Sequence, residues 1–208
     1  MKKLSFAPLL LAGILLTTTA TASDDVWKSL TSHEGSITLS LPPTWVNGNP
    51  KDPKSKEDLA KLKETNPLLY GAVSGDKKVD ETQILLAYDG TDIVLDDEAI
   101  DTISVQKKPS EGLTPELYDL VGKEIEKSLP HKGAYDYKIM DVSFGKMLVY
   151  WTTMVNKDDK GKEKPMDVTG AMFVKGENMF VATIVTGEHQ YKDKKEIFEK
   201  IFKSVTLK

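Results

Sequence analysis

The sequence of 208 residues contains no cysteine, which excludes several kinds of structure and chemistry. No disulfide can form, no thiol can act as a nucleophile, and no thiolate can bind a metal ion. A lipid attached through an N-terminal cysteine is excluded in the same way. The fold must therefore be stabilised by a hydrophobic core, and a chain of this length can bury roughly 70% of its unfolded surface.

Arginine is absent as well, so all 28 basic residues are lysines, against 32 acidic residues. Arginine is the side chain that most often reads guanine and phosphate through two parallel hydrogen bonds. Because it is missing and the balance of charge is acidic, we expect no binding to nucleic acid or to an anionic membrane surface. A surface that mixes lysines with acidic residues instead indicates a soluble protein.

The N-terminal segment "MKKLSFAPLLLAGILLTTTATAS" has the three parts of a secretory signal peptide. Two lysines precede an apolar run over residues 6–16, and small residues end in Ala20, Thr21 and Ala22. The run is shorter than the ~20 residues that a membrane-spanning helix needs, so an uncleaved helix is the weaker alternative. We therefore expect residues 1–22 to be removed between Ala22 and Ser23, leaving no membrane anchor and a periplasmic or secreted protein.

The rest of the chain predicts a flexible lead over residues 23–34 and one domain over residues 35–208. In "GSITLSLPPTW", Ile37, Leu39 and Leu41 alternate with polar residues, as in a strand with one solvated face. The two prolines that follow lack amide hydrogens and end the strand. Trp45, just beyond them, is expected to cover the edge of the core.

The remaining pattern predicts an α+β fold, with an antiparallel β-sheet of about six to seven strands and helices packed on its faces. Ser55 is expected to cap a helix that ends at Asn66 and Pro67, and strands are expected over residues 82–88, 100–106 and, in several segments, 135–186. Two amphipathic helices follow from their apolar spacing. Their predicted buried positions are Leu117, Leu120, Val121, Ile125 and Leu129 in one, and Ile197, Phe198, Ile201, Phe202 and Val205 in the other.

This order of elements, with "ITLSLPPTW", "LTPELYDLVGKEIEKSL" and "KEIFEKIFKSVTL", resembles the Mog1/PsbP-like superfamily, in particular its exported bacterial members of unknown function. The resemblance covers about residues 35–207. Known members include a photosystem II extrinsic subunit, a Ran-binding nuclear factor and loading chaperones of secretion effectors. The resemblance therefore implies a binding or assembly module, but none of the partner-specific motifs of those proteins matches here, so it implies no site residues.

Residues for catalysis are scarce, and the sequence predicts no catalytic residue. There is no G-x-S-x-G motif, and His33, His131 and His189 lie in three separate polar contexts. We therefore expect an exported, soluble, non-catalytic module that binds a protein partner in the cell envelope. The alternative is a hydrolase or other enzyme whose site is assembled from dispersed residues.

Two kinds of ligand deserve separate consideration, and neither leads to a predicted metal site or cofactor. Residues 89–101 carry six carboxylates, as a calcium site requires, although solvated acidic loops have the same composition. Whether this segment binds a cation stays open. Trp27, Trp45 and Trp151 could stack on a saccharide, but Trp151 lies in an apolar strand and is expected in the core.

The segment "NPLLYGAV" at residues 66–73 is the one candidate binding surface in the sequence. It follows the predicted helix and precedes a strand near residue 82, so it is expected to lie in an unusually long connection. Its apolar residues either complete the core or form an exposed patch. In the second case Leu68, Leu69 and Tyr70 are the partner-binding residues, with Tyr70 as a rigid amphipathic anchor.

Overall fold

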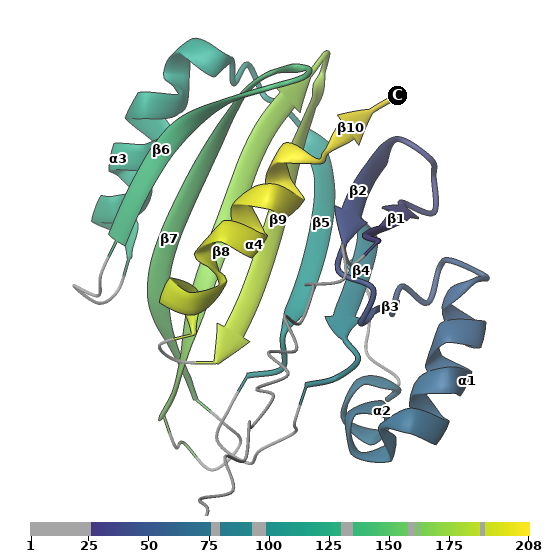
Figure 1. The fold of residues 1–208 in the computed structure, drawn as a ribbon. Coiled ribbons are helices and arrows are strands. Elements are labelled where there is room, and N and C mark those ends of the chain that lie inside the picture. Colours follow the sequence, from purple (N-terminus) through teal and green to yellow (C-terminus); the bar gives the residue numbers. More distant parts are fainter. Residues whose placement is uncertain are drawn as a thin grey trace, which may run out of the picture.

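The computed structural model describes residues 26–75, 80–92, 99–129, 135–157, 161, 163–187 and 190–208. Its main element is a seven-stranded sheet in which every pair of neighbours is antiparallel (Figure 1). The predicted α+β class is therefore confirmed. In spatial order the strands are β3 (Trp45–Asn47), β4 (Gln83–Asp89), β5 (Thr102–Pro109), β9 (Asn178–Gly187), β8 (Glu163–Lys175), β7 (Gly145–Lys157) and β6 (Tyr135–Val142).

A second sheet of three strands contains the beginning and the end of the described chain. In it β2 (Ile37–Leu41) lies between β1 (Lys28–Thr31) and β10 (Thr206–Leu207). The lead predicted over residues 23–34 therefore contains a strand, which the sequence analysis missed. Leu30 and Trp27 pack against the core, and the Lys200 ammonium lies 4.0 Å from the centre of the Trp27 ring. These contacts explain why β1 is ordered.

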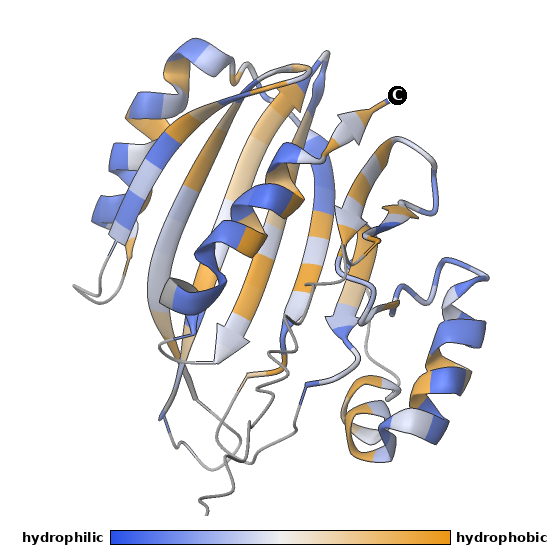
Figure 2. Cartoon of the chain, viewed as in Figure 1, coloured by the Kyte–Doolittle hydropathy of each residue, from blue (hydrophilic) through white to orange (hydrophobic). Residues whose placement is uncertain are grey.

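The larger core lies between one face of the seven-stranded sheet, β2 and the C-terminal helix α4 (Tyr191–Lys203) (Figure 1). The alternating residues Ile37, Leu39 and Leu41 are fully buried there, and Trp45 and Trp151 belong to the same cluster, as predicted. Figure 2 shows hydrophobic positions alternating with hydrophilic ones along β2 and β5. This period of two is what allowed the strands to be predicted.

The opposite face of the sheet carries helices at both ends. The short 3-10 helix η1 (Pro115–Leu117) leads into α3 (Tyr118–Ser128), which packs on β6 and β7. At the other end, α1 (Ser55–Thr65) and α2 (Pro67–Val73) form a smaller apolar cluster with Tyr88 and Leu86 of β4. Among the described residues, no helix is long and apolar enough to cross a membrane.

The buried stripe predicted for α3 is only partly correct. Leu117 and Leu120 are 41% and 56% exposed, whereas Tyr118 and Gly122 are buried. The cause is the fit of Gly122 over Tyr137 of β6: a Cβ atom at residue 122 would lie 2.6 Å from that ring. Only glycine allows the helix to approach β6 so closely, and this contact turns Leu117 and Leu120 away from the core.

The region around residue 66 differs from the prediction as well. Ser55 lies inside the first turn of α1 and donates its hydroxyl hydrogen to the Asp52 carbonyl at 2.8 Å, so it is not the N-cap. Asn66 ends α1, as predicted, but it also begins a second helix. Its side chain accepts a hydrogen bond from the Leu69 amide at 3.2 Å, and Pro67 occupies the first turn of α2. Residues 67–73 are therefore a helix, not the long connection that was expected.

Candidate functional site

A hollow of about 640 Å³ lies at the end of the sheet where β5 ends and β9 begins. Register pairs Lys108 of β5 with Met179 of β9, on the face of the sheet that carries α3. The connection from β5 to η1 forms the rest of its wall. The residues that line it are Thr82, Lys108, Pro109, Ser110, Glu111, Gly112, Leu113, Leu117 and Met179.

The wall of the hollow contains a tight turn at residues 110–113 with an unusual backbone. The Leu113 amide donates to the Ser110 carbonyl, and the Ser110 amide donates to the Glu177 carbonyl, both at 2.8 Å. Glu111 and Gly112 have φ angles of 48° and 85°, so both are left-handed. Glycine adopts this conformation without strain, but glutamate does so at a cost. Such strain concentrates at functional positions, so Glu111 marks this turn as a candidate site.

The apolar part of the hollow comes from side chains that the core leaves out. Leu117 lines it, and Leu120, one turn further along the same helical segment, is more exposed still. Large apolar side chains clustered at an open depression with a polar rim are typical of protein-binding surfaces. Lys108 and Glu111 supply opposite charges on the lining. The arrangement can receive an apolar side chain of a partner and flank it with charges of both signs.

The predicted patch at Leu68, Leu69 and Tyr70 is not one continuous exposed surface. Leu69 is fully buried in the cluster between α1, α2 and β4, which corrects its assignment as an exposed residue. Leu68 is 73% exposed, and Tyr70 is half-buried, with the Lys63 ammonium 5.7 Å from its ring centre. Helical geometry separates neighbouring residues by 100°, so Leu68 and Leu69 cannot share a face. A binding role for Leu68 and Tyr70 stays a prediction.

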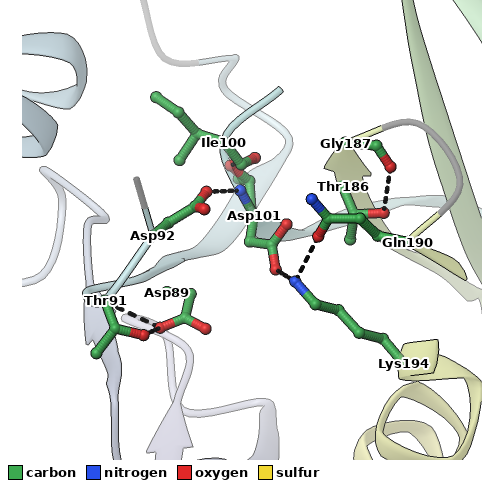
Figure 3. A network of polar contacts seen from close by, with 10 residues as sticks. Asp89, Thr91, Asp92, Ile100, Asp101, Thr186, Gly187, Gln190 and Lys194 are labelled. Carbon is green, nitrogen blue, oxygen red and sulfur yellow. Dashed lines mark hydrogen bonds and ion pairs between the residues drawn. The ribbon is translucent and has the colours of Figure 1, made fainter. Parts of the chain in front are cut away.

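The described part of the acidic segment, residues 89–92 and 99–101, contains an ion pair between Asp101 and Lys194 of α4 (Figure 3). The Lys194 ammonium donates to Asp101 Oδ2 and, at 2.7 Å, to Gln190 Oε1. Asp92 Oδ2 accepts the Asp101 amide hydrogen at 2.7 Å. Asp96, Asp97 and Glu98 lie outside the described residues. Within the described ranges, no three His, Asp or Glu side chains are placed to hold a metal ion.

Asp101 is 2% exposed, and its burial raises the pKa of its carboxyl group to about 6. The hydrogen bond and charge of Lys194 act in the opposite direction, while Asp92 and Asp89 add to the rise in pKa. A carboxyl group with such a pKa could in principle transfer protons near neutrality. Asp101 lines neither the hollow nor the cavity next to Trp151. Its ion pair with Lys194 joins the first turn of α4 to the residue before β5.

The enzyme alternative depends on ionisable groups that converge in a cavity. A cavity of about 170 Å³ contains Asp136, Asp167 and Lys195, with Trp151 on its wall. Sites for small molecules usually enclose ~300 Å³ or more. Trp151 is only 3% exposed, and the Lys195 and Lys138 ammonium groups lie 4.9 and 5.3 Å from the centre of its ring, so the ring is not available to stack on a saccharide. His33 Nδ1 lies 3.0 Å from the Ile84 carbonyl, and His131 and His189 are outside the described residues.

No protein-family model and no curated protein matches this sequence. Solved structures similar to it include the Ran-binding protein Mog1p of Saccharomyces cerevisiae, at 13% identity and a TM-score of 0.49, over 87% of this chain and 95% of that one. They also include PsbP (CyanoP) of Synechocystis sp. PCC 6803, at 9% identity and a TM-score of 0.45, over 93% and 99%. The chain resembles Mog1 and PsbP in fold.

A protein of Bacteroides thetaiotaomicron is similar at 8% identity and a TM-score of 0.47, over 87% of this chain. The chain spans about half of that structure, 48% of its length. These likenesses concern the fold only. They assign no role to the residues of the hollow, whose function has to be inferred from their chemistry. The sequence analysis did not identify these residues. One feature of the sequence could have indicated them: "PSEGLTPEL", a turn followed by a helix that starts at a proline.

Proposed function

We propose that this chain is an exported, soluble, non-catalytic module that binds a protein partner in the cell envelope. The observation that carries the proposal is the hollow at the end of β5 and β9, with the exposed Leu117 on its lining and the exposed Leu120 one helical turn further along the chain. Exposed leucines lower solubility unless a partner covers them. Tight contacts between proteins commonly form where an apolar side chain enters such a depression and polar groups surround it.

The chemistry of the hollow favours a protein over other ligands. Its lining mixes aliphatic and sulfur-containing side chains with one lysine and one glutamate, so it has no excess of charge for phosphate or for a metal ion. It is open to solvent, whereas small molecules are usually enclosed on most sides. Export is supported by residues 1–22 of the sequence, which have the parts of a signal peptide.

Binding at the hollow is tested by placing a charge on its apolar rim. We expect Leu117→Asp with Leu120→Asp to abolish recovery of the partner that co-purifies with the tagged protein from the envelope, because a buried carboxylate without a partner is costly. Ile197→Asp is the matched control. Ile197 is 40% exposed, nearly as much as Leu117, but it lies on α4 at the other face of the sheet.

The control variant should recover the partner as the wild type does, and all variants should keep the wild-type circular dichroism. Equal recovery by the double variant and the wild type would show that the hollow is not the binding surface. If Leu68→Asp loses the partner while the double variant recovers it fully, the partner binds to the surface of α2 and not to the hollow.

A further inference from the structure

Strand β6 forms an outer edge of the seven-stranded sheet, at the left of Figure 1. It pairs with β7 over its whole length of eight residues. Among the residues that the structure describes, no backbone hydrogen bond reaches its other side. A long strand with a free edge pairs readily with another strand, and proteins usually prevent this with charged residues or a covering segment.

The pairing across the sheet determines which groups of β6 face outward. Successive residues of an antiparallel strand direct their N–H and C=O groups alternately to the two sides. The bond from the Ser110 amide to Glu177 sets this alternation for β5 and β9. The registers of β9, β8 and β7 are unbroken, so the same alternation can be followed from strand to strand as far as β6. It follows that the even-numbered residues of β6 point their N–H and C=O groups toward β7. The backbone groups of Tyr135, Tyr137, Ile139 and Asp141 therefore point outward.

The charges on β6 are arranged so that the strand complements itself. An antiparallel partner must place odd-numbered residues opposite one another, so a second β6 has few allowed registers. One places Tyr137 opposite Tyr137, and Asp136 then faces Lys138 of the second copy twice, once on each side of the symmetry axis. If the second copy is moved along the strand to the next allowed register, Lys138 lies opposite Lys138. If it is moved in the opposite direction, Asp136 lies opposite Asp136. Like charges directly opposite each other oppose pairing, and unlike charges favour it.

The other face of the strand fits the same register. Tyr135 would lie opposite Ile139 of the second copy, and this contact would cover a side chain that is 40% exposed. Both tyrosines are already held in place: Tyr135 donates to the Gly122 carbonyl and Tyr137 to Asp119 Oδ1, each at 2.8 Å. Fixed aromatic side chains lose little entropy on binding. Lys138, which bonds to Glu199 at 2.6 Å, would lie between that carboxylate and Asp136 of the second copy.

We propose that two copies of this chain pair through their β6 edges, antiparallel and with Tyr137 opposite Tyr137, so that their two sheets become one continuous sheet. The charges of β6 then have two effects. They oppose addition of an unrelated strand, and they admit a second copy in a single register. The occupant of this edge is a second copy of the chain, whereas the hollow at β5 and β9 is left free for a different protein.

Sedimentation velocity of the purified protein between about 1 and 100 μM tests the proposal, because this range covers dissociation constants of moderately stable dimers. The wild type is expected to become dimeric as concentration rises. Asp136→Lys should weaken the dimer at least about tenfold, because it places lysines opposite each other. Lys138→Asp, made together with Glu199→Lys to keep the contact with α4, should weaken it equally.

Mixing these two variants should restore a dimer, because each then supplies the charge that the other lacks. Ile139→Pro should abolish the dimer by removing an outward amide, while the matched variant Ile139→Thr keeps that amide and should stay dimeric. A wild type that sediments as a monomer throughout the range would overturn the proposal. So would a dimer that persists in both Asp136→Lys and Ile139→Pro, or a mixture of the two charge variants that stays monomeric.

Discussion

Leu68 and Leu69 are neighbours in α2, but one is exposed and the other is fully buried. The helix begins at the Asn66 side chain, which fixes its rotation so that Leu69 and Val73 face α1 and β4. The sequence analysis could find this apolar segment but could not separate its two leucines, because it did not recognise the helix. Composition alone does not show which side of a segment faces the core.

We expect Leu69→Ala to lower the free energy of unfolding by about 2 to 5 kcal/mol, because it leaves a cavity among Leu62, Val73 and Tyr88. The matched variant Leu68→Ala should change it by less than about 0.5 kcal/mol. Urea unfolding of both variants checks this. Equal losses of stability in the two would contradict the burial described for α2.

Glu111 combines a left-handed backbone with a place in the wall of the hollow. Asparagine tolerates this conformation better than glutamate, so Glu111→Asn should raise the free energy of unfolding by about 0.5 to 1 kcal/mol. Glu111→Ala removes the same carboxylate without relieving the strain and should be no more stable than the wild type. Unfolding of both variants in urea separates the two effects. An asparagine variant less stable than the alanine variant would show that the backbone of residue 111 is not strained.

At the scale of elements, the longer strands were predictable, whereas the short strands β1, β3 and β10 and the orientation of one helix were not. In a strand with one solvated face, alternating apolar residues identify the buried face, as Ile37, Leu39 and Leu41 do in β2. The helix at residues 118–128 contains apolar residues around more than half of its circumference, so several rotations bury a similar stripe. Its actual rotation depends on Gly122 meeting Tyr137, two residues from separate elements. The exposed leucines of the hollow follow from that contact and could not be predicted.

The ion pair between Asp101 and Lys194 joins β5 to α4 and makes the stability of this contact depend on pH. The folded-state pKa of Asp101 is about 6, above its ordinary value of 3.8. The folded state therefore binds this proton more tightly than the unfolded state does. The contribution of Asp101 to stability is greatest below about pH 4 and declines as pH rises to about 6.

The difference in unfolding free energy between the wild type and Asp101→Asn should follow this dependence. Relative to the variant, the wild type should lose stability from pH 4 to pH 7, by an amount on the order of 1 to 3 kcal/mol. If the difference for Asp101→Asn rises with pH instead, then Lys194 outweighs burial and the pKa of Asp101 lies below 3.8.

At the scale of the whole molecule, the fold class could be predicted but the site could not. The longer strands and the amphipathic helices follow from local periodicity, and the antiparallel sheet with its helices matches the α+β expectation of about six to seven strands. The hollow is lined by residues near 82, 108–113, 117 and 179, which only the sheet topology brings together. The beginning of the mature chain is a further property of the whole molecule, and it is still a prediction.

We expect the intact mass of the protein recovered from the soluble envelope fraction to correspond to a chain that begins at Ser23. Ala20 and Ala22 are the small residues that a signal peptidase requires before its cleavage site. The apolar run that precedes them is too short to span a bilayer. Replacing Ala22 with a bulky residue should block processing. Full-length wild-type protein in the membrane pellet would contradict the prediction of export by a cleaved signal.

The most direct measurement of the proposed function is crosslinking from the hollow itself. A photoreactive amino acid placed at position 117 should form a crosslinked product of one defined mass with an envelope protein, and the same group at position 197 on α4 should not. Leu120→Asp, combined with the probe at 117, should reduce the yield. The account is contradicted if positions 117 and 197 give the same products in the same yield, because the hollow would then have no more affinity for a partner than any other exposed surface.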